Sequence, residues 1–144
     1  MKKLAWFFAL IIFSVSAVAD DKPFKQFGNH KVFYSAFNST FIQPDIADVY
    51  KITRGKDKGL VNIALVHGDT VGGQSAIVSG SVSNIFAQSQ TLNFFEVREG
   101  DSVYYLAPFT FENEDFLTFK VNVKADANSP AYAISFQKTF YHEE

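Results

Sequence analysis

The sequence predicts an all-β fold: an antiparallel, immunoglobulin-like β-sandwich of about seven strands with one short helical segment, behind an N-terminal signal peptide. Three observations lead to this prediction. Apolar and polar residues alternate at period two through most of the chain after Val32, which is typical of half-buried antiparallel strands. The stretches are joined by short polar connections that leave no room for crossover helices between most strands. The chain has no cysteine, so its apolar core must hold the fold together.

The first 19 residues have the three parts of a secretory signal peptide. Lys2 and Lys3 form a positive start, residues 4–13 are an unbroken apolar run, and small residues lead to an Ala-Val-Ala site at Ala19. The alternative is an uncleaved membrane anchor, but the run is shorter than the roughly 20 apolar residues of a spanning helix. We therefore expect cleavage after Ala19, a periplasmic location, and one β-sandwich domain over residues 20–144.

Without its signal peptide the chain is mildly acidic. Removing Lys2 and Lys3 leaves 11 basic residues against 15 acidic ones, a net charge of −4. Nucleic-acid binding usually requires a basic footprint, and binding to anionic lipid requires clustered lysine and arginine. The charge therefore argues against a nucleic-acid partner and against attachment to a membrane surface after cleavage. The 14 phenylalanines that remain after residue 19 supply the aromatic core that a cysteine-free domain needs.

The expected strands follow one another along the chain. They are residues 32–37, 61–65, 76–86, 91–98, 102–111, 116–124 and 132–141. The alternation is clearest in 116–124, whose apolar face comprises Leu117, Phe119, Val121 and Val123. Gly100 can turn a tight hairpin because glycine accepts a positive φ. A true immunoglobulin domain carries a Cys…Trp…Cys spacing, which is absent here, so the expectation concerns the sandwich architecture alone.

One segment departs from the strand pattern. Residues 43–52 place Ile46, Val49 and Tyr50 at helical spacing, and Pro44 suits the first turn of a helix. We expect a short helix that covers one open end of the sheet. Its apolar residues are interpreted as a plug of the core in preference to a lid over a ligand.

Four stretches of the chain resemble a known family. They are residues 33–44, 59–63, 99–107 and 136–141. Together, and in this order, they resemble the small exported bacterial proteins of domain-of-unknown-function family 4426. The resemblance covers nearly the whole chain after the signal peptide. It implies export and a single compact domain, and it brings no activity, ligand or catalytic residue with it.

Residues that carry chemistry are sparse. The three histidines, His30, His67 and His142, are far apart in the sequence, whereas a catalytic zinc site usually has three protein ligands. His67 and Asp69 are the one pair that a metal site or a small hydrolase would use. There is no thiol and no Gly-x-Ser-x-Gly nucleophile motif. We therefore expect no catalytic residues, no metal and no cofactor.

Aromatic residues are the remaining candidates for a binding site. Several strands are apolar on both faces, and such strands lie either between packed layers or at an interface. The candidate ligand or partner residues are Tyr34, Phe95, Tyr104 and Tyr105. Three functions stay open: a non-enzymatic periplasmic binding or adaptor domain for an envelope protein, a carrier with an aromatic cavity for a small apolar ligand, and a small hydrolase that assembles a histidine and a carboxylate in space.

Overall fold

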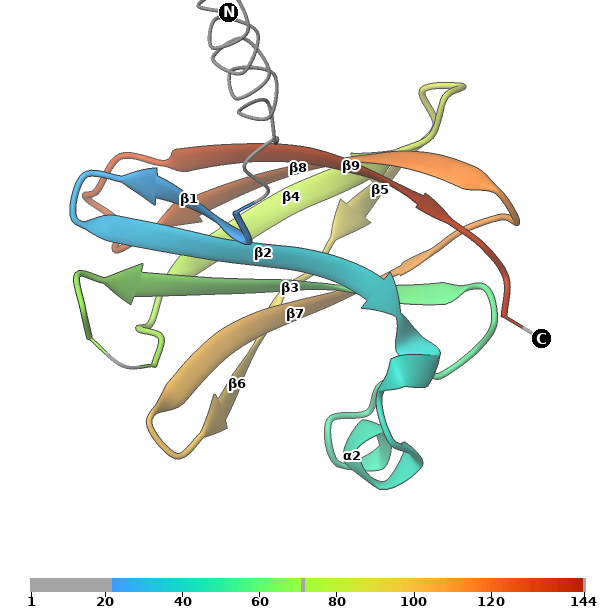
Figure 1. Ribbon diagram of the computed structural model, residues 1–144, viewed down its shortest axis with the longest axis horizontal. Coiled ribbons are helices and arrows are strands. Elements are labelled where there is room, and N and C mark those ends of the chain that lie inside the picture. Colours follow the sequence, from blue (N-terminus) through green and yellow to red (C-terminus); the bar gives the residue numbers. More distant parts are fainter. Residues whose placement is uncertain (1–21, 71, 144) are drawn as a thin grey trace, which may run out of the picture.

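The computed structural model of the protein describes residues 22–70 and 72–143, so the expected signal peptide lies outside the described residues. These residues form nine strands in two antiparallel sheets, with one short helix and one 3-10 turn (Figure 1). The predicted all-β sandwich is confirmed. Within the described residues, no helix is long and apolar enough to cross a membrane.

The two sheets have five and four strands. The five-stranded sheet has the order β1-β2-β3-β7-β6, with β1 (Phe24–Phe27), β2 (His30–Asn38), β3 (Lys58–His67), β7 (Ser102–Thr110) and β6 (Phe95–Glu99). The four-stranded sheet has the order β5-β4-β8-β9, with β5 (Ser89–Leu92), β4 (Ile77–Ser83), β8 (Asp115–Lys124) and β9 (Tyr132–Phe140). The short helical elements η2 (Ser39–Phe41) and α2 (Pro44–Val49) join β2 to β3.

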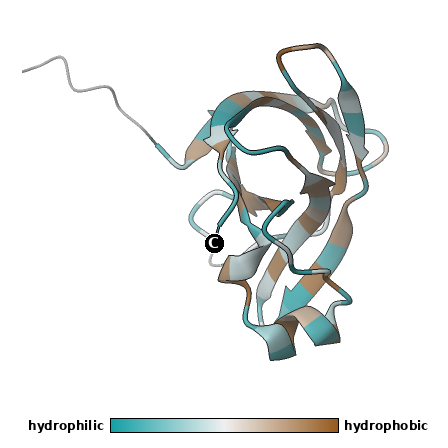
Figure 2. Cartoon of the chain, turned by 90° about the vertical axis from the view of Figure 1, so that its right-hand side faces the viewer, coloured by the Kyte–Doolittle hydropathy of each residue, from teal (hydrophilic) through white to brown (hydrophobic). Residues whose placement is uncertain are grey.

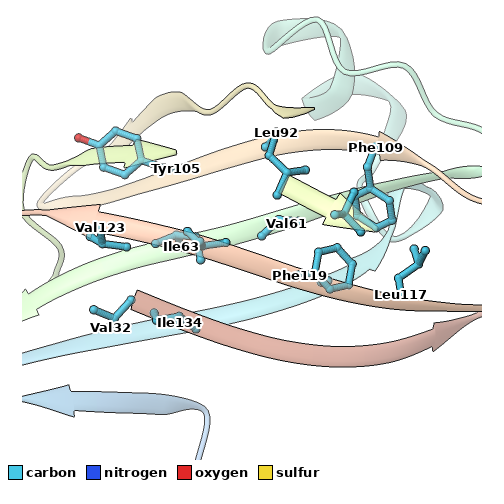
Figure 3. Close-up of a cluster of buried hydrophobic side chains, with 14 of the residues drawn as sticks. Val32, Val61, Ile63, Leu92, Tyr105, Phe109, Leu117, Phe119, Val123 and Ile134 are labelled. Carbon is cyan, nitrogen blue, oxygen red and sulfur yellow. The ribbon is translucent and has the colours of Figure 1, made fainter. Parts of the chain in front are cut away.

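The core lies between the two sheets (Figure 3). The apolar face that the alternation predicts for β8 is confirmed, since its four side chains are at most 2% exposed. Phe119 stands at the centre of this core, and its ring centre lies 5.1 Å from that of Phe109 and 4.8 Å from that of Phe136. The interior is therefore filled by aromatic rings contributed by both sheets.

Two features of the strands differ from the expectation. The stretch 91–98 is divided between β5 and β6, which belong to different sheets, because the chain crosses from one sheet to the other at residues 93–94. Both sides of the crossing are anchored by a buried side chain, Leu92 on β5 and Val97 on β6, so the apolar pattern continues across it. In addition, the sequence does not predict β1. This strand and the division of 91–98 account for nine strands where about seven are predicted.

The stretch 76–86 also ends early, at Ser83. The Asn84 side chain accepts hydrogen bonds from the backbone N–H groups of Phe86 and Gln88 and so closes a loop. Such local bonds favour turns over strands. Ile85 and Phe86 lie on this loop and are 70% and 77% exposed.

The short helix is present where it was expected, but it does not plug the core. Ile46 and Val49 are 42% and 73% exposed, and only Ala47 is buried. Viewed along the sandwich, the helix lies outside the ring of strands (Figure 2). The expectation was wrong on this point because helical spacing identifies an apolar stripe without identifying the surface that the stripe covers.

Candidate functional site

The outward face of the five-stranded sheet is unusually apolar. Side chains alternate between the faces of a strand, so β7 directs Tyr105 into the sandwich and Tyr104 and Leu106 away from it. The outward face of an antiparallel sheet is commonly solvated. Here three apolar side chains of the sheet that are not part of the main core are nevertheless at most 5% exposed: Leu60, Val97 and Leu106. We call this surface the outer face.

One half of the outer face is covered by the segment that contains α2. Just after the helix, the Tyr50 hydroxyl donates a hydrogen bond to Glu99 Oε1 over 3.3 Å, at the end of β6. Ile52 then lines a groove of about 330 Å³ together with Phe95 and Pro108 of the outer face. The helical segment thus acts as a cover that is fastened to the sheet at one side.

The other half of the outer face is an open hollow of about 320 Å³. Its lining includes Phe33 of β2, Asn62 and Ala64 of β3, Tyr104 of β7, and Gly73 of the loop before β4. A smaller hollow of about 160 Å³ adjoins it and shares Phe33, Asn62 and Ala64. We call the two together the Asn62 hollow.

Asn62 is the chemically distinctive residue of this hollow. Its Oδ1 atom is buried and has no hydrogen-bond partner among the described residues. In the register of the sheet Asn62 lies beside Ser35 of β2 and Leu106 of β7, and neither side chain gives its Oδ1 atom a hydrogen bond. Sequence reasoning missed this residue, and its signal was a single amide within an otherwise apolar stretch, Leu60 to Val66.

The four aromatic residues proposed from the sequence do not form one site. Tyr104 and Phe95 lie on the outer face, where Tyr104 lines the Asn62 hollow and Phe95 lines the neighbouring groove. Tyr105 is 6% exposed and belongs to the core. Tyr34 packs against that core and places its ring centre 4.8 Å from that of Phe136.

Both tyrosines of β7 bind carboxylates of β6. The Tyr105 hydroxyl donates to Glu96 Oε2 over 2.8 Å and accepts a hydrogen bond from the Ala76 N–H over 2.8 Å. The Tyr105 hydroxyl, helped by Arg98, holds the pKa of Glu96 below its usual value. The Tyr104 hydroxyl donates to Glu99 Oε1 over 2.9 Å. Burial, followed by this hydrogen bond to Glu99, raises the pKa of Tyr104 to about 12.

These contacts predict a loss of stability at high pH. The folded protein keeps the Tyr104 proton up to a pKa of about 12, whereas the unfolded chain releases it near the ordinary value of about 10. The free energy of unfolding is therefore expected to be unaffected by this group below about pH 10 and to fall between about pH 10 and 12. Chemical denaturation at several pH values measures the fall, which should be shallower in Tyr104→Phe. Parallel curves for the two proteins would contradict the assignment.

His67 does not line the hollow, although Val66 and Thr70 beside it do, and its ring lies beside a different partner from the one proposed. No ion pair joins it to Asp69 in the described part of the chain, whereas its ring centre is 4.9 Å from that of His30. His30 Nδ1 lies 2.9 Å from the Tyr132 hydroxyl oxygen. Residues 22–70 and 72–143 hold no group of three or more histidine, cysteine, aspartate or glutamate side chains placed to bind a metal.

Comparisons with known proteins identify relatives of the whole domain. A family model described as "Domain of unknown function (DUF4426)" matches residues 24–143. The crystal structure of the DUF4426 family protein PA0388 from Pseudomonas aeruginosa is 30% identical, with a TM-score of 0.75, and the match covers 84% of this chain and 95% of that one. No curated protein matches the chain.

More distant structures share the fold alone. FetP from uropathogenic Escherichia coli, recombinantly expressed in the periplasm, is 8% identical with a TM-score of 0.53 over 84% of this chain and 94% of FetP. A copper-bound variant of FetP gives 8% identity and a TM-score of 0.57 over 83% and 95% of the two chains.

Proposed function

This chain belongs to the DUF4426 family, whose description names no activity, and we propose its function from its own structure. It is a non-enzymatic binding domain of the periplasm. It holds an aromatic side chain of an envelope protein in the Asn62 hollow on the outer face.

The observation that carries this proposal is the unpartnered Oδ1 atom of Asn62. A buried acceptor without a hydrogen bond costs about 1–3 kcal/mol, and such an atom in a native protein calls for an explanation. An N–H or O–H donor on a bound partner would supply the missing hydrogen bond and so explain the atom. The remaining lining, with Phe33, Ala64 and Tyr104, is suited to an apolar body.

The partner's chemistry follows from this lining. An aromatic side chain with a polar donor, as in tryptophan or tyrosine, presents an apolar body and one hydrogen-bonding group. The larger part of the Asn62 hollow, of about 320 Å³, is near the lower limit for a drug-sized ligand, for which sites of roughly 300–1,000 Å³ are usual. It therefore suits a single large side chain of a protein better than a separate molecule.

The two other candidate functions have weaker support. A carrier would enclose its ligand between the sheets, where the rings of Phe109, Phe119, Phe136 and Phe140 contact one another. The hydrolase was assigned to His67 and Asp69, and His67 instead lies against His30. Export is inferred from the signal sequence, and FetP, which was recombinantly expressed in the periplasm, adds only a shared fold.

Site-specific photo-crosslinking in the periplasm tests the proposal. A benzophenone amino acid at Phe33 keeps an aromatic ring in the hollow, and the matched control places it at Gln137, which is exposed on β9 of the other sheet. We expect a discrete adduct with one envelope protein from position 33 and none from position 137. Intact mass spectrometry of the same preparations should show a chain that begins at Asp20.

The decisive variant is Asn62→Leu in the crosslinking protein. It removes the unpartnered oxygen at similar side-chain volume, so we expect the adduct to be lost while the free energy of unfolding stays equal or rises by about 1 kcal/mol. An adduct that persists without Asn62 would contradict the proposed recognition. A clear loss of stability in this variant would mean that Asn62 serves the fold and not a partner.

A further inference from the structure

Two histidines face each other at one end of the sandwich, on the opposite face of the five-stranded sheet from the Asn62 hollow. His30 begins β2 and His67 ends β3, and the two residues are direct partners in the register of these strands. Val32 and Leu65, two residues along each strand, are fully buried in the core. Because side chains alternate along a strand, both imidazoles point toward the inside of the sandwich at its open end.

The surroundings hold this pair in place. The Gly68 N–H donates to the Asn29 carbonyl over 2.6 Å, which ties the end of β3 to the turn that precedes β2. On the opposite sheet, the Tyr132 hydroxyl lies 2.9 Å from His30 Nδ1. The Tyr132 ring is itself stacked on Phe27 at a centroid distance of 4.6 Å. Three strands of one sheet and one of the other thus fix the position of His30.

The spacing of the two rings fits a shared metal ion. Their centres are 4.9 Å apart and their planes are inclined by 65°. Two imidazoles that bind one ion at about 2.0–2.1 Å in neighbouring coordination positions, about 90–110° apart, have ring centres about 4.5–5.2 Å apart. His67 is exposed and His30 is partly exposed, so an ion reaches the pair directly from solvent.

The hydroxyl of Tyr132 completes the arrangement. A histidine that binds a metal usually donates its second ring N–H to an acceptor, which fixes the tautomer and orients the ring. With Nδ1 of His30 donating to the Tyr132 oxygen, Nε2 keeps a free lone pair for the ion. Tyr132 is therefore a positioning residue and not a ligand.

We propose that His30 and His67 form a binding site for a divalent transition-metal ion, with Cu(II) held most tightly. Imidazole nitrogen suits copper and zinc, and affinity for a given set of nitrogen ligands is greatest for Cu(II). Two protein ligands leave the other coordination positions to water, so the ion is exchangeable and does not support the fold. The site is independent of the proposed binding of a protein partner.

Titration with Cu(II), followed by electron paramagnetic resonance, tests the proposal on protein purified from the periplasm. We expect one ion per chain and hyperfine coupling from two imidazole nitrogens. His30→Gln and His67→Gln should each weaken binding at least tenfold. His142→Gln is the matched control, because His142 lies at another site, with Nε2 3.2 Å from the Phe111 carbonyl oxygen, and should leave the affinity unchanged.

Further measurements separate ligation from folding. Tyr132→Phe keeps both ligands and removes the acceptor, so binding should weaken about tenfold while the two-nitrogen signal is retained. Melting curves without metal should be similar for the wild type and both histidine variants. Copper binding that survives the double variant His30→Gln/His67→Gln, or a signal from a single imidazole, would overturn the site. Tighter binding of Zn(II) than of Cu(II) would overturn the assignment of the ion.

Discussion

Replacing Phe119 by alanine is expected to lower the free energy of unfolding by about 3–5 kcal/mol, the usual cost of removing a fully buried phenylalanine. Phe119 is 0% exposed, and its ring contacts those of Phe109, Phe136 and Phe140 from both sheets. The neighbouring strands are paired on both sides of β8, so they cannot close the cavity by moving inward. Urea denaturation measures the loss.

The matched control for this prediction is Phe116→Ala on the same strand. Phe116 is 42% exposed, so its removal leaves no enclosed cavity and should cost less than about 1 kcal/mol. The two variants differ in the face of β8 that they alter and not in chemistry. Equal losses would contradict a core that lies between the two sheets.

The same core also determines the geometry of the proposed binding site. Val61, Ile63 and Leu65 of β3 are buried on the inner side of the sheet. Because a slip of one residue would bring the opposite face inward, these three side chains fix β3 in register. That register directs Asn62 and Ala64 to the outer face. Packing inside the sandwich therefore determines that Asn62 and Ala64 line a hollow on the outer face.

The parts of the fold that were predictable are those in which local alternation decides burial. β8 is the best example, since its apolar face in the sequence is its buried face in the structure. The crossing at residues 93–94 was not predictable, because Leu92 and Val97 are both apolar and both buried although they belong to different sheets. The position of α2 was also not predictable from the sequence, because the surface that it covers belongs to strands that are distant along the chain.

The candidate site was only partly predictable, because the register and pairing of the strands decide which residues meet. Tyr104 and Tyr105 are adjacent and similar in sequence, and only the register of β7 shows that one lines the hollow while the other enters the core. Asn62 gains its significance from atoms of β2 and β7. His30 and His67 become neighbours through the pairing of β2 with β3. These relations are tertiary, so motif spacing cannot reveal them.

Replacing Gly73 by alanine is expected to destabilise the protein by about 3 kcal/mol, at the upper end of the usual cost of overpacking. A Cβ atom at this position would overlap the Val103 carbonyl oxygen. Val103 cannot retreat, because it is buried and its strand is paired with β6. The loop also cannot move freely, since the next residue, Gln74, donates its N–H to the Leu65 carbonyl over 2.8 Å.

Gly68→Ala is the control, because it introduces the same methyl group where no atom lies within 4 Å. Its φ of +57° should make that change cost about 1–2 kcal/mol, less than at Gly73. Gly73 also lines the Asn62 hollow, so Gly73→Ala should weaken the adduct formed from position 33, whereas Gly68→Ala should preserve it. An order of stabilities opposite to this one would show that the loop does not pack against β7, and the hollow would then lack one of its walls.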